Sequence, residues 1–214
     1  MHFIVLASAF ILVGHINFLP DWTYAHGVQV SLMDRPFDIL FSSEKVILLP
    51  LIIFGISKLY EINLETRAWR AGRISFIATL AGALILIGPA LALHYVRFEP
   101  KLPSIGFIWG IHNLAFVCVI EELLFRNYLF EGLGRWFKKN GYPIVYTTLI
   151  SSILFGLNHF RSGAALVLLA TIAGAVYAWA YKKSGIVAAI LSHFGVNLIH
   201  FLLFSYPSIQ RGLH

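Results

Sequence analysis

The sequence VIEELLFR, residues 119–126, places two adjacent carboxylates and an arginine inside a stretch that is otherwise apolar from Ile105 to Phe130. A charged side chain at the centre of a membrane-spanning helix costs about 2.5–3.5 kcal/mol. Three such groups so close together would be strongly disfavoured on a lipid-facing surface. We therefore expect Glu121, Glu122 and Arg126 to face a protein interior or a wet cavity, which makes this stretch a candidate functional site.

The composition predicts an integral, multi-pass membrane protein. Of the 214 residues 58% are hydrophobic and 12% are charged, and the mean hydropathy is +0.78. Soluble domains carry about 25% charged residues, twice this share. The net charge of +6 is then best explained by basic loops that face anionic lipid headgroups, so we expect membrane lipids and no nucleic acid as partners. A single cysteine, Cys118, excludes an intrachain disulfide.

The chain reads as one transmembrane domain, residues 1–214, with an all-α fold of about seven membrane-spanning helices. A helix needs about 20 mainly apolar residues to cross the hydrocarbon. Residues 20–41 read as a loop and residues 61–73 as a short amphipathic connector. The last three segments are joined by very short turns, so they should be antiparallel neighbours. The candidate spans are 2–19, 42–60, 74–96, 104–130, 143–160, 163–181 and 185–205.

Polar residues recur in the later spans at helical spacing. Residues four apart lie on one face of a helix, and three such pairs contain groups that can do chemistry. They are Glu122 with Arg126, Phe155 with His159, and His193 with Asn197.

A register comparison places these groups in one layer of the membrane. If the chain turns near Lys138, then near Ser162 and Lys183, residue 121 lies level with residue 155 and with residue 197. His159 and His193 lie four residues away from that level, about 6 Å at 1.5 Å per residue. Two carboxylates, two imidazoles and an amide are therefore expected close together, although the rotation of each helix is open.

Structural explanations exist for single members of this set. Glu122 and Arg126 could be a buried ion pair that holds two helices together. A second carboxylate, Glu121, has no basic partner at helical spacing, which favours a functional role. His112 falls roughly opposite Glu121 on its helix and is expected to be structural, whereas His200 shares the face of Asn197.

Together these groups suit attack by water on an amide. A carboxylate in a low-dielectric site can act as a base near neutral pH. A carboxylate and a histidine across a small cavity can hold and deprotonate one water. An asparagine amide and a histidine N–H one turn apart can donate hydrogen bonds to a developing oxyanion. The chain contains neither Gly-x-Ser-x-Gly nor His-Glu-x-x-His.

At these residues the chain resembles the CPBP family of CAAX proteases and bacteriocin-processing intramembrane endopeptidases, also called the Abi family. The family pattern is Glu-Glu-x-x-x-Arg, then Phe-x-x-x-His, then His-x-x-x-Asn or Asp, on successive helices. All three parts occur here in order, and the resemblance covers a catalytic core of about residues 104–205.

The resemblance implies a glutamate-dependent membrane peptidase without a metal or other cofactor. By position, Glu121 would be the general base and would act with His159 on the attacking water. His193 and Asn197 would stabilise the oxyanion, with Glu122 and Arg126 in supporting roles. The expected partner is a peptide or protein substrate at the membrane, and a lipidated substrate is one option. The short chain resembles prokaryotic members, which implies the cell (inner) membrane.

Two other functions remain open at this point. Glu121, His159 and His193 could be three ligands of a Zn²⁺ ion with an open fourth position, which would make the protein a metal-dependent membrane hydrolase. Intramembrane glutamate, histidine and arginine also occur in proton relays, so a proton-coupled transporter or a non-catalytic immunity protein is the third candidate.

Overall fold

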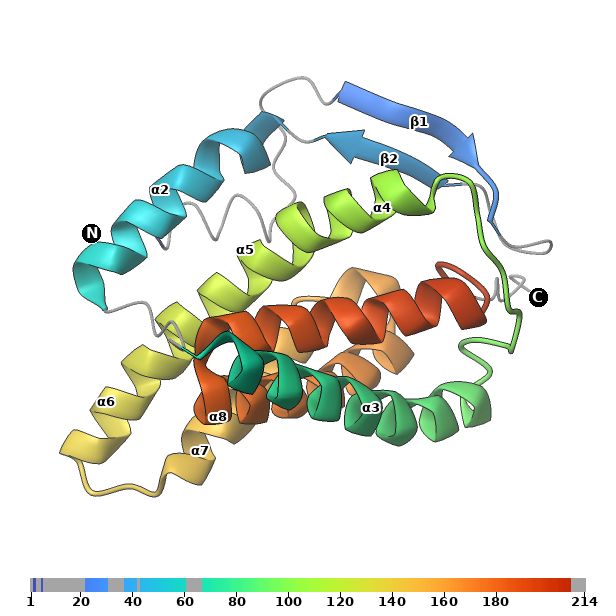
Figure 1. Ribbon diagram of the computed structural model, residues 1–214. Helices are drawn as coiled ribbons and strands as arrows, with labels where there is room; N and C mark the ends of the chain where they lie inside the picture. The colour runs from blue at the N-terminus through green and yellow to red at the C-terminus, as the bar shows by residue number, and fades with distance from the viewer. Residues whose placement is uncertain are drawn as a thin grey trace.

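The computed structural model describes residues 2, 5, 22–30, 37–41, 43–60 and 67–208 and is mostly helical (Figure 1). The predicted first span, residues 2–19, lies outside the described residues except for residues 2 and 5. The elements are β1 (Trp22–Val28), β2 (Phe37–Phe41), α2 (Ser43–Leu59), α3 (Ala68–Ala92), α4 (Gly106–His112), η1 (Asn113–Cys118), α5 (Val119–Glu122), η2 (Leu123–Phe130), α6 (Glu131–Lys139), α7 (Ile144–Leu157), η3 (Phe160–Ser162) and α8 (Ala164–Leu203).

Three helices are long and apolar enough to cross a membrane: Ala68–Ala92, Gly106–Lys139 and Ala164–Leu203. Large apolar side chains such as Phe76, Leu80 and Leu84 of α3 point outward, which suits contact with lipid and not with water. The protein is therefore an integral membrane protein with a mainly α-helical fold. The predicted number of about seven spans is not confirmed, because only these three meet the length and hydropathy expected of a span within the described residues.

The last element, α8, reverses direction in its middle. Ser184 and Gly185 have non-helical backbone angles, and Gly185 has a φ of +72° that favours glycine. Tyr177 and His193 stack with ring centroids 4.6 Å apart, although a straight helix would separate residues so far apart in sequence by about 24 Å. We refer to residues 164–183 as the first leg of α8 and to residues 186–203 as the second leg. The tight turn predicted near residues 182–184 is thus present.

The glutamate pair lies in one long helix that runs from Gly106 to Lys139. Two stretches of it, η1 and η2, have the wider π-helical winding, in which the backbone N–H bonds the carbonyl five residues earlier. The four-residue α-helical segment α5 between them carries Glu121 and Glu122. This helix extends past the predicted end at residue 130, because α6 continues it. α6 is strongly amphipathic and ends in Lys138 and Lys139.

Glycines allow the helices around the glutamates to pack closely. A Cβ added at Gly156 of α7 would overlap the hydroxyl of Thr171 and the carbonyl oxygen of Val167 on the first leg of α8. A Cβ at Gly195 on the second leg would overlap Thr79 of α3. Figure 1 shows α3 and the red second leg side by side. These close approaches bring α3, α7 and both legs of α8 around one interior region.

The segment that was predicted to be a loop, residues 20–41, contains a small antiparallel sheet instead. Trp22 pairs with Phe41 and Val28 with Phe37, with irregular register between them. Aromatic and β-branched residues are common in this hairpin, and they favour extended backbone. The loop was predicted from the polar and proline residues of this segment, which interrupt its aromatic and β-branched residues. The all-α prediction is therefore correct for the bulk of the chain and wrong for this hairpin.

Candidate functional site

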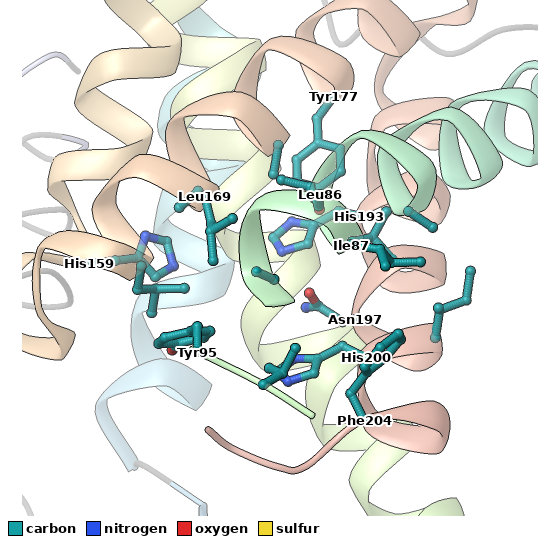
Figure 2. Close-up of a pocket in the computed structure, with 18 of the residues that line it drawn as sticks. Leu86, Ile87, Tyr95, His159, Leu169, Tyr177, His193, Asn197, His200 and Phe204 are labelled. Atoms are coloured by element: carbon teal, nitrogen blue, oxygen red, sulfur yellow. The ribbon is translucent and has the colours of Figure 1, made fainter. Parts of the chain in front are cut away.

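An apolar cavity of about 150 Å³ lies between α3, α7 and the two legs of α8. Most of its wall is aliphatic, and most of its polar groups belong to one helix. His193, Asn197 and His200 follow one another at helical spacing on the second leg, and Figure 2 shows them in a column. His159, which follows the end of α7, reaches the cavity from the other side, and Tyr177 reaches it from the first leg. A mostly apolar pocket with a few convergent polar groups is typical of a ligand or active site.

The carboxylate of Glu122 joins the long helix to this cavity wall. Its Oε1 lies 2.9 Å from Nδ1 of His193, and its Oε2 lies 3.0 Å from Nε of Arg126. Glu122 and Arg126 are both fully buried. Because a carboxylate oxygen only accepts hydrogen bonds, Nδ1 of His193 carries the hydrogen. The other ring nitrogen, Nε2, is thus left for contacts in the cavity.

Arg126 is held by three different kinds of contact. Besides its ion pair with Glu122, its Nη2 donates to the carbonyl oxygen of Gly174 at 3.3 Å. Its Cζ lies 4.6 Å from the ring centroid of Phe155 and 5.8 Å from that of Tyr177. The predicted pair Glu122–Arg126 is therefore a buried ion pair, and it is also part of the site because the same carboxylate bonds His193.

Aromatic rings fix the plane of His193. The ring of Tyr177 stacks on it at 4.6 Å with an interplanar angle of 15°, and Phe155 meets it edge-on at 5.6 Å. Phe155 also contacts the ring of His159 at 5.3 Å. Phe155 thus lies between the two histidines, which explains why an aromatic residue is useful one turn before His159.

His159 has one defined hydrogen bond, whereas the amide nitrogen of Asn197 donates to Oδ1 of Asn113 and, more weakly, to Sγ of Cys118 at 3.8 Å. Nδ1 of His159 lies 3.0 Å from the carbonyl oxygen of Phe155. Since a carbonyl oxygen only accepts, this nitrogen carries the hydrogen and Nε2 is left as an acceptor. Nδ2 of Asn197 donates to Oδ1 of Asn113 at 3.1 Å, and Asn113 also accepts from the thiol of Cys118 at 3.3 Å.

Glu121 occupies a different position from its neighbour. Its Oε2 is buried and has no hydrogen-bond partner among the described residues. Neither glutamate belongs to the described residues that line the cavity. Among the residues described, the structure therefore brings together His159, His193 and Asn197 at the cavity and joins Glu122 and Arg126 to His193. It shows no hydrogen bond between Glu121 and His159, and the roles assigned to all these residues stay predictions.

Several residues of the site were not expected from the sequence. Tyr177 and Asn113 are the main ones, and Tyr95, just after α3, also lines the cavity. Burial raises the pKa of the Tyr95 phenol, so this group stays a neutral hydrogen-bond donor at neutral pH. Tyr177 could have been found from the turn at Gly185, because it lies as far before that residue as His193 lies after it. Nothing in the sequence distinguished Asn113 from other polar residues.

The described residues contain no group of three histidine, cysteine, aspartate or glutamate side chains close enough to hold a metal ion. The set Glu121, His159 and His193, which was considered for Zn²⁺, is thus not gathered in this arrangement.

The fold and the cavity together define a membrane-embedded helical protein with imidazoles and an amide around one apolar pocket, and with a buried carboxylate bonded to one of these imidazoles. Residues 102–199 match the family model described as type II CAAX prenyl endopeptidase Rce1-like. This match confirms the family predicted from the motifs, and it covers all three motif pairs. No curated protein and no solved structure matches the chain.

Proposed function

We propose that this protein is a membrane endopeptidase that hydrolyses a peptide bond with a water molecule activated by a glutamate and a histidine. The observation that carries the proposal is the fully buried contact between Glu122 and His193 beside a cavity that also holds His159 and Asn197. Charged groups inside a membrane protein are costly and rare, and those that occur usually pair with one another and mark functional sites. The match to a CAAX endopeptidase family over residues 102–199 supports a hydrolytic role for this site.

In the proposed reaction, Glu121 takes a proton from water that is also held by His159. The water oxygen bonds to the carbonyl carbon, and the carbonyl electrons move to the oxygen to form a tetrahedral oxyanion. The C–N bond then breaks, and the proton passes from Glu121 to the leaving amine nitrogen. Two observations support these roles: Oε2 of Glu121 is buried without a partner among the described residues, and Nε2 of His159 is not used by its bond to Phe155.

The oxyanion is assigned to His193 and Asn197 on one face of the second leg. Nδ1 of His193 donates to Glu122, so His193 can donate from Nε2 only in its protonated form. The carboxylate of Glu122 would stabilise that imidazolium, and Arg126 holds this carboxylate in place through its other oxygen. Asn197 adds an amide N–H one helical turn away.

A second arrangement of the same reaction is favoured by the contact between Glu122 and His193. A carboxylate that accepts from Nδ1 leaves a neutral imidazole with Nε2 as a base, as in hydrolytic triads. His193 would then deprotonate the water, and Glu121 and His159 would be less important. The two arrangements differ in the base: the first needs an ionised Glu121 for activity, and the second does not.

The substrate that fits this site is a peptide or protein at the membrane, and a lipidated C-terminal segment suits the mostly apolar cavity wall. We also propose that the protein spans a prokaryotic cell membrane several times.

The substrate can be identified by mass spectrometry of membrane fractions from cells that contain wild type or the Glu121→Gln variant. Fragments present only with wild type identify the substrate and the scissile bond.

The mechanism is tested with purified protein and quenched-fluorescence peptides, both lipidated and unlipidated. Glu121→Gln is expected to abolish turnover without lowering the unfolding temperature, and His159→Ala is expected to lower kcat by about 10²–10⁴-fold. Normal turnover by Glu121→Gln would exclude Glu121 as the base and favour the Glu122–His193 arrangement. Glu131→Gln, a carboxylate that bonds Tyr181 outside the cavity, is the matched control. Activity lost to a chelator and restored by zinc would instead support a metal-dependent hydrolase.

A further inference from the structure

Tyr177 is placed where a reacting group would contact it. It lines the cavity together with His193 and Asn197, and its ring lies parallel to that of His193 at 4.6 Å. Figure 2 shows Tyr177 next to His193 and on the same side of the cavity. Phe155 packs against its ring at 5.9 Å with perpendicular planes, so the hydroxyl has a defined direction.

The proposed oxyanion site is short of hydrogen-bond donors. One ring N–H of His193 is committed to Glu122, and a neutral His193 has no second one. One amide hydrogen of Asn197 is committed to Asn113, and the same nitrogen lies 3.8 Å from the weakly accepting Sγ of Cys118, which leaves at most a single N–H for a substrate oxygen. Oxyanion sites in amide hydrolysis are typically built from two or more donors.

We propose that the hydroxyl of Tyr177 is a further hydrogen-bond donor to the oxyanion formed at the carbonyl carbon. This inference rests on the proposed function, and it holds in either arrangement of the base. The Tyr177 hydroxyl matters most if His193 is the base, because Asn197 would then be the one other donor to the oxyanion on this face of the second leg. A phenol O–H donates to an oxyanion without being deprotonated, so the hydroxyl is unchanged when the C–N bond breaks.

The inference is tested with the substitution Tyr177→Phe, which removes one oxygen and keeps the ring that stacks on His193. The expected result is a kcat lower by about 10²–10³-fold with little change in KM. Tyr181→Phe is the matched control: Tyr181 is equally buried on the same leg, but its hydroxyl bonds Asn127 and Glu131. This control should retain wild-type kcat.

A binding measurement separates a catalytic donor from a structural one. A peptide with a phosphinate in place of the scissile amide mimics the tetrahedral oxyanion. Tyr177→Phe should weaken binding of this analogue by the same factor that it lowers kcat/KM, while binding of the uncleaved amide by an inactive Glu121→Gln background stays unchanged. A variant that binds the phosphinate as tightly as wild type overturns the inference.

A second substitution covers the case in which Tyr177→Phe does not fold. 3-Fluorotyrosine placed at position 177 keeps the ring and the hydroxyl but makes the hydroxyl more acidic, so kcat and its pH profile should change, whereas the same replacement at position 181 should not change them. If kcat is unchanged at 177, the inference fails. If Asn197→Ala still lowers kcat in that case, only the role of Tyr177 is wrong and the proposed function stands. If Asn197→Ala and Glu121→Gln both retain full turnover, the proposed function is wrong as well.

Discussion

The carboxylate of Glu122 and the imidazole of His193 meet between the long helix and the second leg of α8, with 2.9 Å from Oε1 to Nδ1. The same carboxylate pairs with Arg126 through its other oxygen. One buried anion therefore links a permanent cation to the histidine at the cavity wall. Its removal should affect both stability and the orientation of His193.

Glu122→Gln is expected to destabilise the protein, because Arg126 would stay fully buried without its counter-charge. Removing one partner of a buried pair costs about 3–5 kcal/mol. The double variant Glu122→Gln/Arg126→Met should be less destabilised than Glu122→Gln alone, since it leaves no unpaired buried charge. Unfolding in detergent, followed by circular dichroism, measures both. Equal stability of wild type and Glu122→Gln would show that the pair does not stabilise the fold.

Arg126→Lys should lower stability and activity although the charge is kept. A lysine ammonium can face Glu122, but it cannot stack over Phe155 as a plane or donate to Gly174 at the same time. A cation–π contact is worth about 0.5–1 kcal/mol when exposed and about 2 kcal/mol when desolvated. Arg135→Lys is the control, because Arg135 lies over Tyr60 at the same 4.6 Å but is exposed. A loss of stability at position 135 as large as that at 126 would contradict this account.

The helical pairs and the short turns predicted that the long helix, α7 and the second leg of α8 approach one another, but not that α3 and the first leg also line the cavity. Glu122 with Arg126 and His193 with Asn197 lie on shared faces because residues four apart do so on any helix. The turn at Gly185 was predicted from a short basic break between two apolar segments. These features depend on local sequence alone, which is why they could be read from it.

The rotation of the long helix could not be predicted. Adjacent helical residues point about 100° apart, so a register comparison cannot tell whether Glu121 or Glu122 faces His193. The π-helical stretches on both sides of the pair change that rotation further. The comparison aligned Glu121 with Asn197, whereas the structure bonds Glu122 to His193. The depth of each residue in the membrane could be predicted from the lengths of the segments. The direction in which each side chain points depends on how the helices pack together, which the sequence of a single helix does not specify.

Asn113→Ala should lower activity without unfolding the protein. Asn113 accepts a hydrogen bond from Asn197, and this contact sets which way the Asn197 amide points. A misdirected donor can cost about 10²-fold in rate, so we expect a fall in kcat of about 10- to 100-fold and a smaller fall for Asn113→Asp, which keeps an acceptor oxygen. Asn140→Ala removes an exposed asparagine that bonds Trp136 and should have no effect. Full activity of Asn113→Ala would mean that Asn197 is oriented by other contacts.

Gly156→Val should separate α7 from the first leg of α8 and inactivate the protein. An added side chain would meet the backbone carbonyl of Val167, which cannot move aside as a flexible side chain could. Overpacking typically costs about 1–3 kcal/mol, and here it would also displace Phe155 in α7 and His159 just after it, which both line the cavity. Turnover and the unfolding temperature, measured on the same preparation, give both effects.

Two further variants test that the close helix contact at Gly156 is responsible. Gly72→Ala in α3 adds a Cβ with nothing within 4 Å, and alanine favours a helix over glycine by about 1 kcal/mol, so this control should be as active as wild type and equally or more stable. Gly156→Ala/Thr171→Ala removes the overlapping hydroxyl and should be more active than Gly156→Ala. If Gly156→Val keeps wild-type turnover, α7 and the first leg need not touch at this point, and the position of His159 would have to be set by residues outside this contact.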